Sequence, residues 1–340
     1  PIPKSEECNV ETPDTSTVTA PLVTFQGGRV APLAPPNPVL DEERPIENTD
    51  DIPYEKSIEV ESQVAISLEV CQGNVRINGW DRDEVRAFVS GGSKVGFRPA
   101  PPKKKNGKTS SITVLGYDPK VDKGSNLRDC LYGDEIELDV PTGARINIKG
   151  REASITIKSV AKVTIANNDG DISLSEIEEG IDAKTYEGDI SVENSSGVIK
   201  LDSTNGSIFA YNTEPIEVGD ALTAKSNSGS VILQLVNHSL VTARSLSGLV
   251  KFQGEIQSDG QYRFENTSGQ ILLEIPEESS CLLEAIAAKN KFSASGFKFI
   301  RFDVGKIDST LQQVKAQMGE GEASISLQSQ SGKITLVKLN

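Results

Sequence analysis

The sequence predicts an all-β fold, and within that class a parallel β-solenoid: a single-stranded, β-helix-like stack of coils about 20 residues long. Glycine recurs from Gly170 to Gly269 at intervals of 18, 18, 23, 19 and 21 residues. Apolar residues occupy the same four positions around each of these glycines. Only 5% of the chain is aromatic whereas 29 of its 340 residues are glycine, so the core must be built from aliphatic side chains.

Four apolar columns define each repeat. Two of them stand seven and five residues before the glycine, at Val163, Ile181, Ile199, Leu222, Val241 and Tyr262, and at Ile165, Ala183, Leu201, Ala224, Ala243 and Phe264. The other two stand two and four residues after it, at Ile172, Ile190, Ile208, Val231, Val250 and Ile271, and at Leu174, Val192, Ala210, Leu233, Phe252 and Leu273. A period of two on each side predicts two short strands that flank a turn, once per coil.

The same columns continue beyond the six regular repeats. They fit around Gly332 and Gly73, and also around Ala153 and Asn290, where another residue replaces the glycine. Asn tolerates the left-handed backbone conformation that such a turn can require. We therefore expect structural glycine turns at Gly73, Gly170, Gly188, Gly206, Gly229, Gly248, Gly269 and Gly332.

An antiparallel β-sandwich is the alternative fold, because it also has short strands separated by turns. A sandwich gives no reason for four columns to stay in register through successive units. In a parallel solenoid each apolar residue stacks on its counterpart about 4.8 Å above or below. Four residues before their turns, Lys184, Asp202 and Lys225 follow one another, so parallel stacking also alternates charge between neighbouring coils.

The chain divides into a leader and one long domain. Residues 1–56 hold 10 of the 17 prolines together with acidic runs, which predicts a largely extended leader or linker. Residues 57–340 form the predicted solenoid, with irregular N-terminal coils over 57–140, a basic loop at 94–110 and regular coils over 141–295. The period breaks after 295, so we expect a C-terminal hairpin or capping coil over 296–340.

One outward-facing column is less polar than the rest. Three residues after their glycines stand Phe209, Ile232 and Leu272. We interpret this column as an interaction surface that the leader, the basic loop or a partner chain covers. Scattered apolar surface residues are the alternative interpretation.

The basic loop carries three consecutive lysines, Lys103, Lys104 and Lys105, with no acidic residue among its charges. Such a run is either a patch for an acidic polymer or a solvated loop tip.

Four cysteines, Cys8, Cys71, Cys130 and Cys281, stand far apart, which excludes a zinc knuckle and a thioredoxin-like pair. Cys71 and Cys130 lie near the ends of the N-terminal region and are a possible disulfide if the protein is exported. Buried free thiols, which pack as small apolar groups, are the alternative.

Composition excludes several classes of function. The formal charge is −14, which repels nucleic acid and anionic membranes. No run of 18 apolar residues is present, so we expect no transmembrane segment. With His238 as the single histidine, the chain offers no histidine cluster for a metal and no histidine pair for acid–base catalysis. We expect no catalytic residue, cofactor or metal.

The N-terminal motif is Gln72-Gly73-Asn74-Val75-Arg76-Ile77-Asn78-Gly79-Trp80-Asp81-Arg82-Asp83-Glu84-Val85. Together with the strand over 136–140, the Pro141-Thr142-Gly143-Ala144 turn and the later glycine turns, it resembles the bacterial putative-adhesin family, a domain of unknown function, over about residues 57–340. The resemblance implies a repetitive β-helix-like domain in exported or envelope-associated proteins, often without known enzymatic activity. Within the motif, Trp80 either forms a sugar-binding trio with Asp81 and Asp83 or is a core or cap residue.

We therefore expect a non-catalytic, exported solenoid that presents a rigid surface to a protein or a glycan at the bacterial cell envelope, whether periplasmic, outer-surface or secreted. The chain begins at Pro1, and we expect a signal or anchor segment upstream of it. One alternative is a carbohydrate-active lyase or hydrolase on a β-helix, which would use turn carboxylates such as Asp169, Asp171, Asp189 and Asp202. A second is an envelope-stress or scaffold module that binds a partner protein of the same cell.

Overall fold

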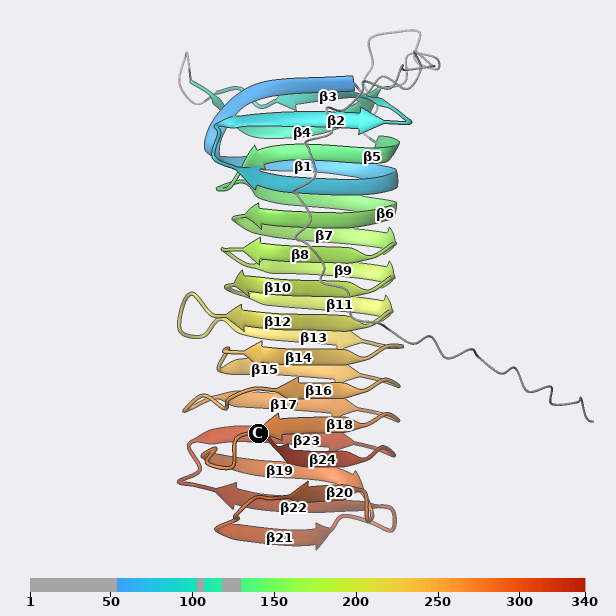
Figure 1. Ribbon diagram of the computed structural model, residues 1–340. Helices are drawn as coiled ribbons and strands as arrows, with labels where there is room; N and C mark the ends of the chain where they lie inside the picture. Colours follow the sequence, from blue (N-terminus) through green and yellow to red (C-terminus); the bar gives the residue numbers. More distant parts are fainter. Residues whose placement is uncertain (1–53, 103–106, 118–129, 340) are drawn as a thin grey trace, which may run out of the picture. The chain divides into compact units, whose positions relative to one another are not determined.

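The computed structural model describes residues 54–102, 107–117 and 130–339, and it builds these residues into strands without a helix (Figure 1). The all-β prediction is confirmed. The N-terminal strands are β1 (Tyr54–Trp80), β2 (Glu84–Ser90), β3 (Lys94–Pro99), β4 (Thr109–Tyr117), β5 (Cys130–Pro141) and β6 (Arg145–Val160). The leader expected over 1–56 lies outside the described residues except for its last three positions, which belong to β1.

Two strands per coil form the regular part of the stack. They are β7 (Lys162–Asp169), β8 (Ile172–Ile177), β9 (Ile181–Glu187), β10 (Ile190–Ser196), β11 (Ile199–Asn205), β12 (Ile208–Glu214), β13 (Ala221–Ser226), β14 (Val231–Val236), β15 (Leu240–Ser245), β16 (Val250–Gln253), β17 (Gln261–Asn266) and β18 (Ile271–Ile275). Each odd-numbered strand pairs in parallel with the next odd one, and each even-numbered strand with the next even one. This parallel pairing confirms the solenoid and excludes the sandwich.

The predicted columns are the observed registers. Val163 pairs with Ile181, which pairs in turn with Ile199, and Ile172 pairs with Ile190 on the other side of the coil. All twenty-four residues of the four columns are at most 2% exposed. Because burying one Leu, Ile or Val side chain stabilises a fold by about 1.5–3 kcal/mol, these columns are the main source of stability in the stack. The expected row of alternating charge is also present, since Asp202 pairs with both Lys184 and Lys225.

Close approach between coils, more than backbone conformation, explains the glycine column. A Cβ added at Gly248 would lie 2.0 Å from the carbonyl oxygen of Gly229, and the same clash with the preceding coil recurs along the regular stack. Within this column only Gly73, Gly170 and Gly188 have a positive φ. Asn290, which replaces a glycine, has a φ of +61°, as expected for Asn at such a turn.

A buried polar column lies beside the glycines, three residues before each of them. It contains Asn167, Thr185, Ser203, Ser226, Ser245, Asn266 and Ser329. From Thr185 to Asn266 each side chain donates a hydrogen bond to the carbonyl of the glycine one coil earlier, as Ser203 does to Gly188 at 2.9 Å. These residues satisfy carbonyls that the tight turn would otherwise leave buried and unpaired.

A second turn on the opposite side of each coil also repeats. Six residues after the glycine position, the backbone is left-handed at Ser159, Glu176, Asn194, Asn212 and Leu235. The side-chain amide of Asn212 donates to Asn194 Oδ1 at 2.8 Å, so this column is partly linked by side chains from coil to coil. Asn is favoured here because it tolerates a positive φ.

The first coils are irregular because the long strand β1 pairs with several strands, in both directions. Its first residues pair antiparallel with β2, whereas its later residues pair in parallel with β5 and β6. The register of β1 with β6 places Gly73 opposite Ala153, in agreement with the predicted columns. A disulfide joins Cys71 in β1 to Cys130 in β5, with their Cα atoms 5.6 Å apart.

The C-terminal strands do not stack in chain order. They are β19 (Cys281–Ala288), β20 (Phe292–Ser295), β21 (Arg301–Lys306), β22 (Leu311–Met318), β23 (Ala323–Ser329) and β24 (Ile334–Lys338). The last coil, β23 and β24, pairs with β17 and β18 on one side and with β19 and β20 on the other. The expected hairpin is β21 and β22, which continues the sheet beyond β19 (Figure 1). The final coil is therefore internal to the stack and is not a capping coil.

Candidate interaction surface

The outward side of the even-numbered strands brings two of the three predicted apolar residues together. Phe209 on β12 pairs directly with Ile232 on β14. Leu272 on β18 lies two strands further on, because Lys251 on β16 occupies the position between it and Ile232. All of these side chains are half-buried on the outer surface.

Two further residues complete this surface, and sequence reasoning missed them. Tyr211 follows Phe209 by two positions on the same face of β12, and the two rings stack with centroids 6.3 Å apart and an interplanar angle of 6°. Gln234 pairs with Tyr211 from β14 and donates from Nε2 to Gln253 Oε1 at 2.7 Å. We call Phe209, Tyr211, Ile232 and Gln234 the platform. The period of two along each strand is the signal that could have identified Tyr211 and Gln234.

The edge of the platform is charged. Lys251 Nζ lies 3.0 Å from Glu274 Oε2, and both side chains are mostly buried against the sheet. The platform and its edge thus combine a pair of parallel aromatic rings, a hydrogen-bonded pair of amides and an ion pair. It lies on strands whose spacing the coil stack holds constant, so the geometry of the surface is set before any ligand arrives.

Only the flanks of the basic loop are described, and they lie away from the platform. The lysines Lys103, Lys104 and Lys105 lie outside the described residues. Of the described flanks, Lys108 Nζ lies 3.3 Å from Asp83 Oδ2, and residues 99–102 and 107–109 border a hollow beside Ile58 and Glu59 on β1. These flanks belong to the N-terminal coils.

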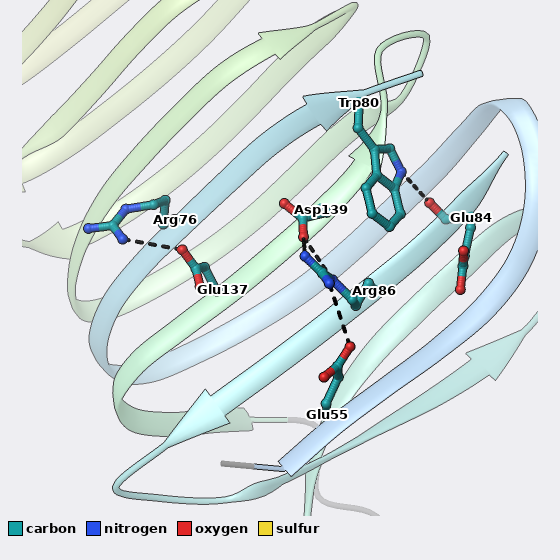
Figure 2. Close-up of polar contacts among 7 residues, drawn as sticks. All are labelled: Glu55, Arg76, Trp80, Glu84, Arg86, Glu137 and Asp139. Carbon is teal, nitrogen blue, oxygen red and sulfur yellow. Dashed lines mark hydrogen bonds and ion pairs between the residues drawn. The ribbon is translucent and has the colours of Figure 1, made fainter. Parts of the chain in front are cut away.

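Trp80 lies at the turn between β1 and β2, with its polar atom already engaged (Figure 2). Its Nε1 donates to the carbonyl of Glu84 at 2.8 Å. The guanidinium groups of Arg82 and Arg86 lie 5.0 and 5.3 Å from the ring centroid, within the range of cation–π attraction. Of the two interpretations of Trp80, this environment fits the structural one, because the side chain stabilises the turn between β1 and β2.

The ion pairs around Trp80 connect the first strands (Figure 2). Arg86 on β2 bonds Asp139 on β5 through both Nε and Nη2, and it also lies 3.7 Å from Glu55 on β1. The hydrogen bond and the charge of Asp139 raise the pKa of Arg86 above its ordinary value. Arg76 and Arg86 already form ion pairs with carboxylates of the same chain, so they offer little to an anionic ligand.

Two of the four turn carboxylates, Asp171 and Asp189, have structural partners. Asp171 Oδ1 accepts a hydrogen bond from the backbone N–H of Asp189 at 2.8 Å, and Asp189 Oδ1 accepts one from Ser207 at 2.7 Å. Serines continue this ladder over the next two coils, where Ser207 and Ser230 accept in the same way. Across the described ranges, no group of three or more His, Cys, Asp or Glu side chains has a geometry that could hold a metal ion.

The remaining reactive groups are buried. His238 is fully buried, its Nε2 lies 2.8 Å from the carbonyl oxygen of Gly197, and its Nδ1 has no hydrogen-bond partner. Burial lowers the pKa of His238 below its usual value. Burial raises the pKa of the free Cys281 thiol to about 12, so this cysteine is unreactive at neutral pH.

The stacked parallel coils define a β-solenoid whose outward strands carry the platform. The Toastrack DUF4097 family model matches residues 64–337, and the chain belongs to that family. This agrees with the resemblance to a family of unknown function found in the sequence. No curated protein matches the chain in sequence.

Three solved structures are similar to the chain at low identity. A putative adhesin from Parabacteroides distasonis is 10% identical with a TM-score of 0.42, over 85% of this chain and 98% of its own. A putative cell adhesion protein from Clostridium sporogenes is 11% identical with a TM-score of 0.25, over 85% and 100%. A putative lipid binding protein from Parabacteroides distasonis is 13% identical with a TM-score of 0.31, over 84% and 96%. Values this low carry no statement about function.

Within the part of the chain that the structure describes, no helix is long and apolar enough to cross a membrane.

Proposed function

We propose that this Toastrack protein is a non-catalytic binding module exported to the bacterial cell envelope, and that its platform binds a glycan there. The observation that carries the proposal is the pair of parallel rings, Phe209 and Tyr211, on a rigid outer face. A preformed surface of this kind needs no rearrangement to bind, which lowers the entropic cost of association.

The chemistry of the platform fits a sugar chain. A pyranose ring has a C–H face that packs on an aromatic ring, and hydroxyl groups around its edge that need hydrogen-bond donors and acceptors. Phe209 and Tyr211 supply two such rings with nearly parallel planes, and Tyr211 is 38% exposed. Gln234 and Gln253 beside them supply amide donors and acceptors at fixed positions.

The disulfide supports the proposed localisation. Disulfides such as Cys71–Cys130 form and persist in oxidising compartments, which include the bacterial periplasm and the cell surface. We propose that the protein works in one of these compartments. Blocking free thiols in intact cells and then analysing the extracted protein would show the pair oxidised, whereas a reduced pair would contradict export.

Binding to an array of bacterial envelope glycans tests the proposed ligand. We expect Phe209→Ala and Tyr211→Ala each to weaken binding by about tenfold, the effect of losing one stacked ring. Tyr186→Ala is the matched control, because Tyr186 is an exposed tyrosine on β9, on the other side of the coil. No binding to any glycan, or binding that both platform variants leave unchanged, would contradict the proposal.

Two other outcomes would favour one of the alternative functions over glycan binding. Release of reducing or unsaturated sugars from acidic polysaccharides would identify the carbohydrate-active enzyme that the turn carboxylates suggested. Capture of one envelope protein by the wild type but not by the Phe209→Ala variant would identify the scaffold module. Each outcome has its own readout, so the three candidate functions are separable in one set of preparations.

A further inference from the structure

The C-terminal end of the stack has an unpaired strand. β21 pairs antiparallel with β22 along one edge, and no other described strand pairs with it. Figure 1 shows β21 at the far end of the sheet, beyond β22 and β19. An open edge of this kind presents backbone N–H and C=O groups in the spacing that another strand requires.

The inward face of β21 is apolar and incomplete. Its register with β22 places Phe302 opposite Ala316 and Val304 opposite Val314, and both of these partners are buried. Phe302 and Val304 are nevertheless 46% and 58% exposed, and the preceding Ile300 is 70% exposed. Exposed apolar residues on the core side of an edge strand indicate that this row continues onto a further strand.

We propose that this further strand is β21 of a second copy, and that the two copies form a two-fold symmetric dimer by antiparallel pairing centred on Phe302. In this register Phe302 faces Phe302 of the second copy, and Ile300 faces Val304. On the outward face Arg301 faces Asp303 of the second copy, and the symmetry repeats that contact. Residues 300–304 are therefore complementary to themselves in both charge and polarity.

The charges select this arrangement. Within one chain Arg301 Nε already lies 2.5 Å from Asp303 Oδ2, in an ion pair that is largely exposed. In the antiparallel register each of these groups gains an opposite charge directly across the interface. An in-register parallel pair would instead place Arg301 against Arg301 and Asp303 against Asp303. The two-fold pair uses the free β21 edge of each copy. The assembly therefore closes as a dimer and does not grow into a fibre through this strand.

The pairing covers a short strand. β21 has six residues, fewer than the number that a standard stable interface contributes from each partner. We therefore expect a weak dimer that dissociates on dilution in the micromolar range.

Sedimentation equilibrium of the full chain over a concentration series tests the dimer. Arg301→Asp and Asp303→Arg each create two like-charge contacts, and we expect each to weaken dimerisation by about tenfold. The double variant Arg301→Asp/Asp303→Arg restores both attractions and should dimerise like the wild type. Mixing the two single variants should give heterodimers, because each then supplies the charge that the other lacks.

Arg263→Asp is the matched control. Arg263 and Glu265 form the same type of ion pair, two residues apart on β17, which is paired on both edges. This change should leave the oligomeric state unaltered, whereas the β21 variants should not.

A cross-linking experiment tests the register. In a Cys8→Ser background, Phe302→Cys places the new cysteine of one copy opposite the same cysteine of the second copy. The Cα atoms of such an antiparallel pair lie about 4.5–5.5 Å apart, a distance at which the two cysteines can form a disulfide. Val304→Cys faces Ile300 instead and should not cross-link. A wild type that stays monomeric at all concentrations overturns the proposal. So does a dimer that the β21 charge changes leave intact, an absence of the Phe302→Cys cross-link, or occupation of β21 by a different protein.

Discussion

At the scale of single residues, two requirements select the side chain at the main turn. The glycine column keeps its residue type because the carbonyl of the preceding coil occupies the space of a Cβ. The position three residues earlier needs a small donor, as at Ser245, whose hydroxyl donates to Gly229 O and accepts from Gly248 N. The glycine position thus has to lack a side chain, and the position three residues earlier has to carry a polar one. Both requirements arise from the same close contact between coils.

We expect Gly248→Ala to lower the free energy of unfolding by about 1–3 kcal/mol, because the added methyl group must displace the neighbouring coil. Gly254→Ala is the control: a Cβ there would meet its nearest atom, Phe252 Cζ, at 3.5 Å, an ordinary contact distance. Urea unfolding followed by circular dichroism measures both. Equal stability of the two variants would show that the close approach is unimportant.

His238 makes stability depend on pH. Because burial lowers its pKa in the folded protein, the unfolded chain binds the proton more readily. The free energy of unfolding should therefore be highest above the unfolded pKa of about 6.5 and should fall as pH decreases towards the folded pKa. The hydrogen bond to the Gly197 carbonyl, followed by the charges of Asp220 and Glu214, opposes this lowering of the pKa without reversing it. We expect His238→Gln to flatten the slope between pH 7.5 and 5.5 in urea titrations, and an unchanged slope would contradict the assignment.

At the scale of the strand and the coil, side-chain ladders connect neighbouring units. The apolar columns could be predicted from the sequence because they alternate with polar residues and recur in every repeat. The buried column from Asn167 to Ser329 could not, since a Ser, Thr or Asn near a glycine also fits an exposed turn. The second turn was missed for a different reason: Glu176 and Leu235 share its left-handed conformation but not a residue type.

We expect Ser245→Ala to lower the free energy of unfolding by about 1–3 kcal/mol, because it leaves the buried carbonyl of Gly229 and the N–H of Gly248 without this partner. Ser247→Ala is the control, since Ser247 bonds Asn227 O at the exposed surface, at 3.3 Å. It should change stability by less than about 0.5 kcal/mol. A hydrogen-exchange comparison would locate the weakened coil, and protection lost equally in both variants would contradict the buried role.

At the scale of the whole molecule, the N-terminal coils and the C-terminal coils depart from simple repetition. The disulfide between Cys71 and Cys130 bridges 59 residues of the irregular N-terminal part. At the other end, the coil of β23 and β24 inserts between coils that precede it in the chain. Regular stacking is a nearest-neighbour property, whereas both of these features join segments that are distant in sequence.

Reduction of the Cys71–Cys130 disulfide should lower the free energy of unfolding by about 2–4 kcal/mol, because it releases a long loop in the unfolded chain. Unfolding with and without reductant measures the difference, and the Cys71→Ser/Cys130→Ser variant should match the reduced wild type. Cys281 provides an internal control: its buried thiol should react with a thiol reagent only after unfolding. Reaction of Cys71 in the native, unreduced protein would contradict the pairing.

The sequence by itself determined the class of fold, the length of the coil and the register of its core, because each coil repeats the contacts of its neighbours and local periodicity therefore specifies the stack. Of the candidate surface, it indicated Phe209, Ile232 and Leu272 but not Tyr211 or Gln234. Only the tertiary structure decided that two rings lie parallel to each other, that a polar column is buried, and that the last coil stacks inside the sheet. These features depend on side-chain packing and on contacts across many residues, which no repeat encodes.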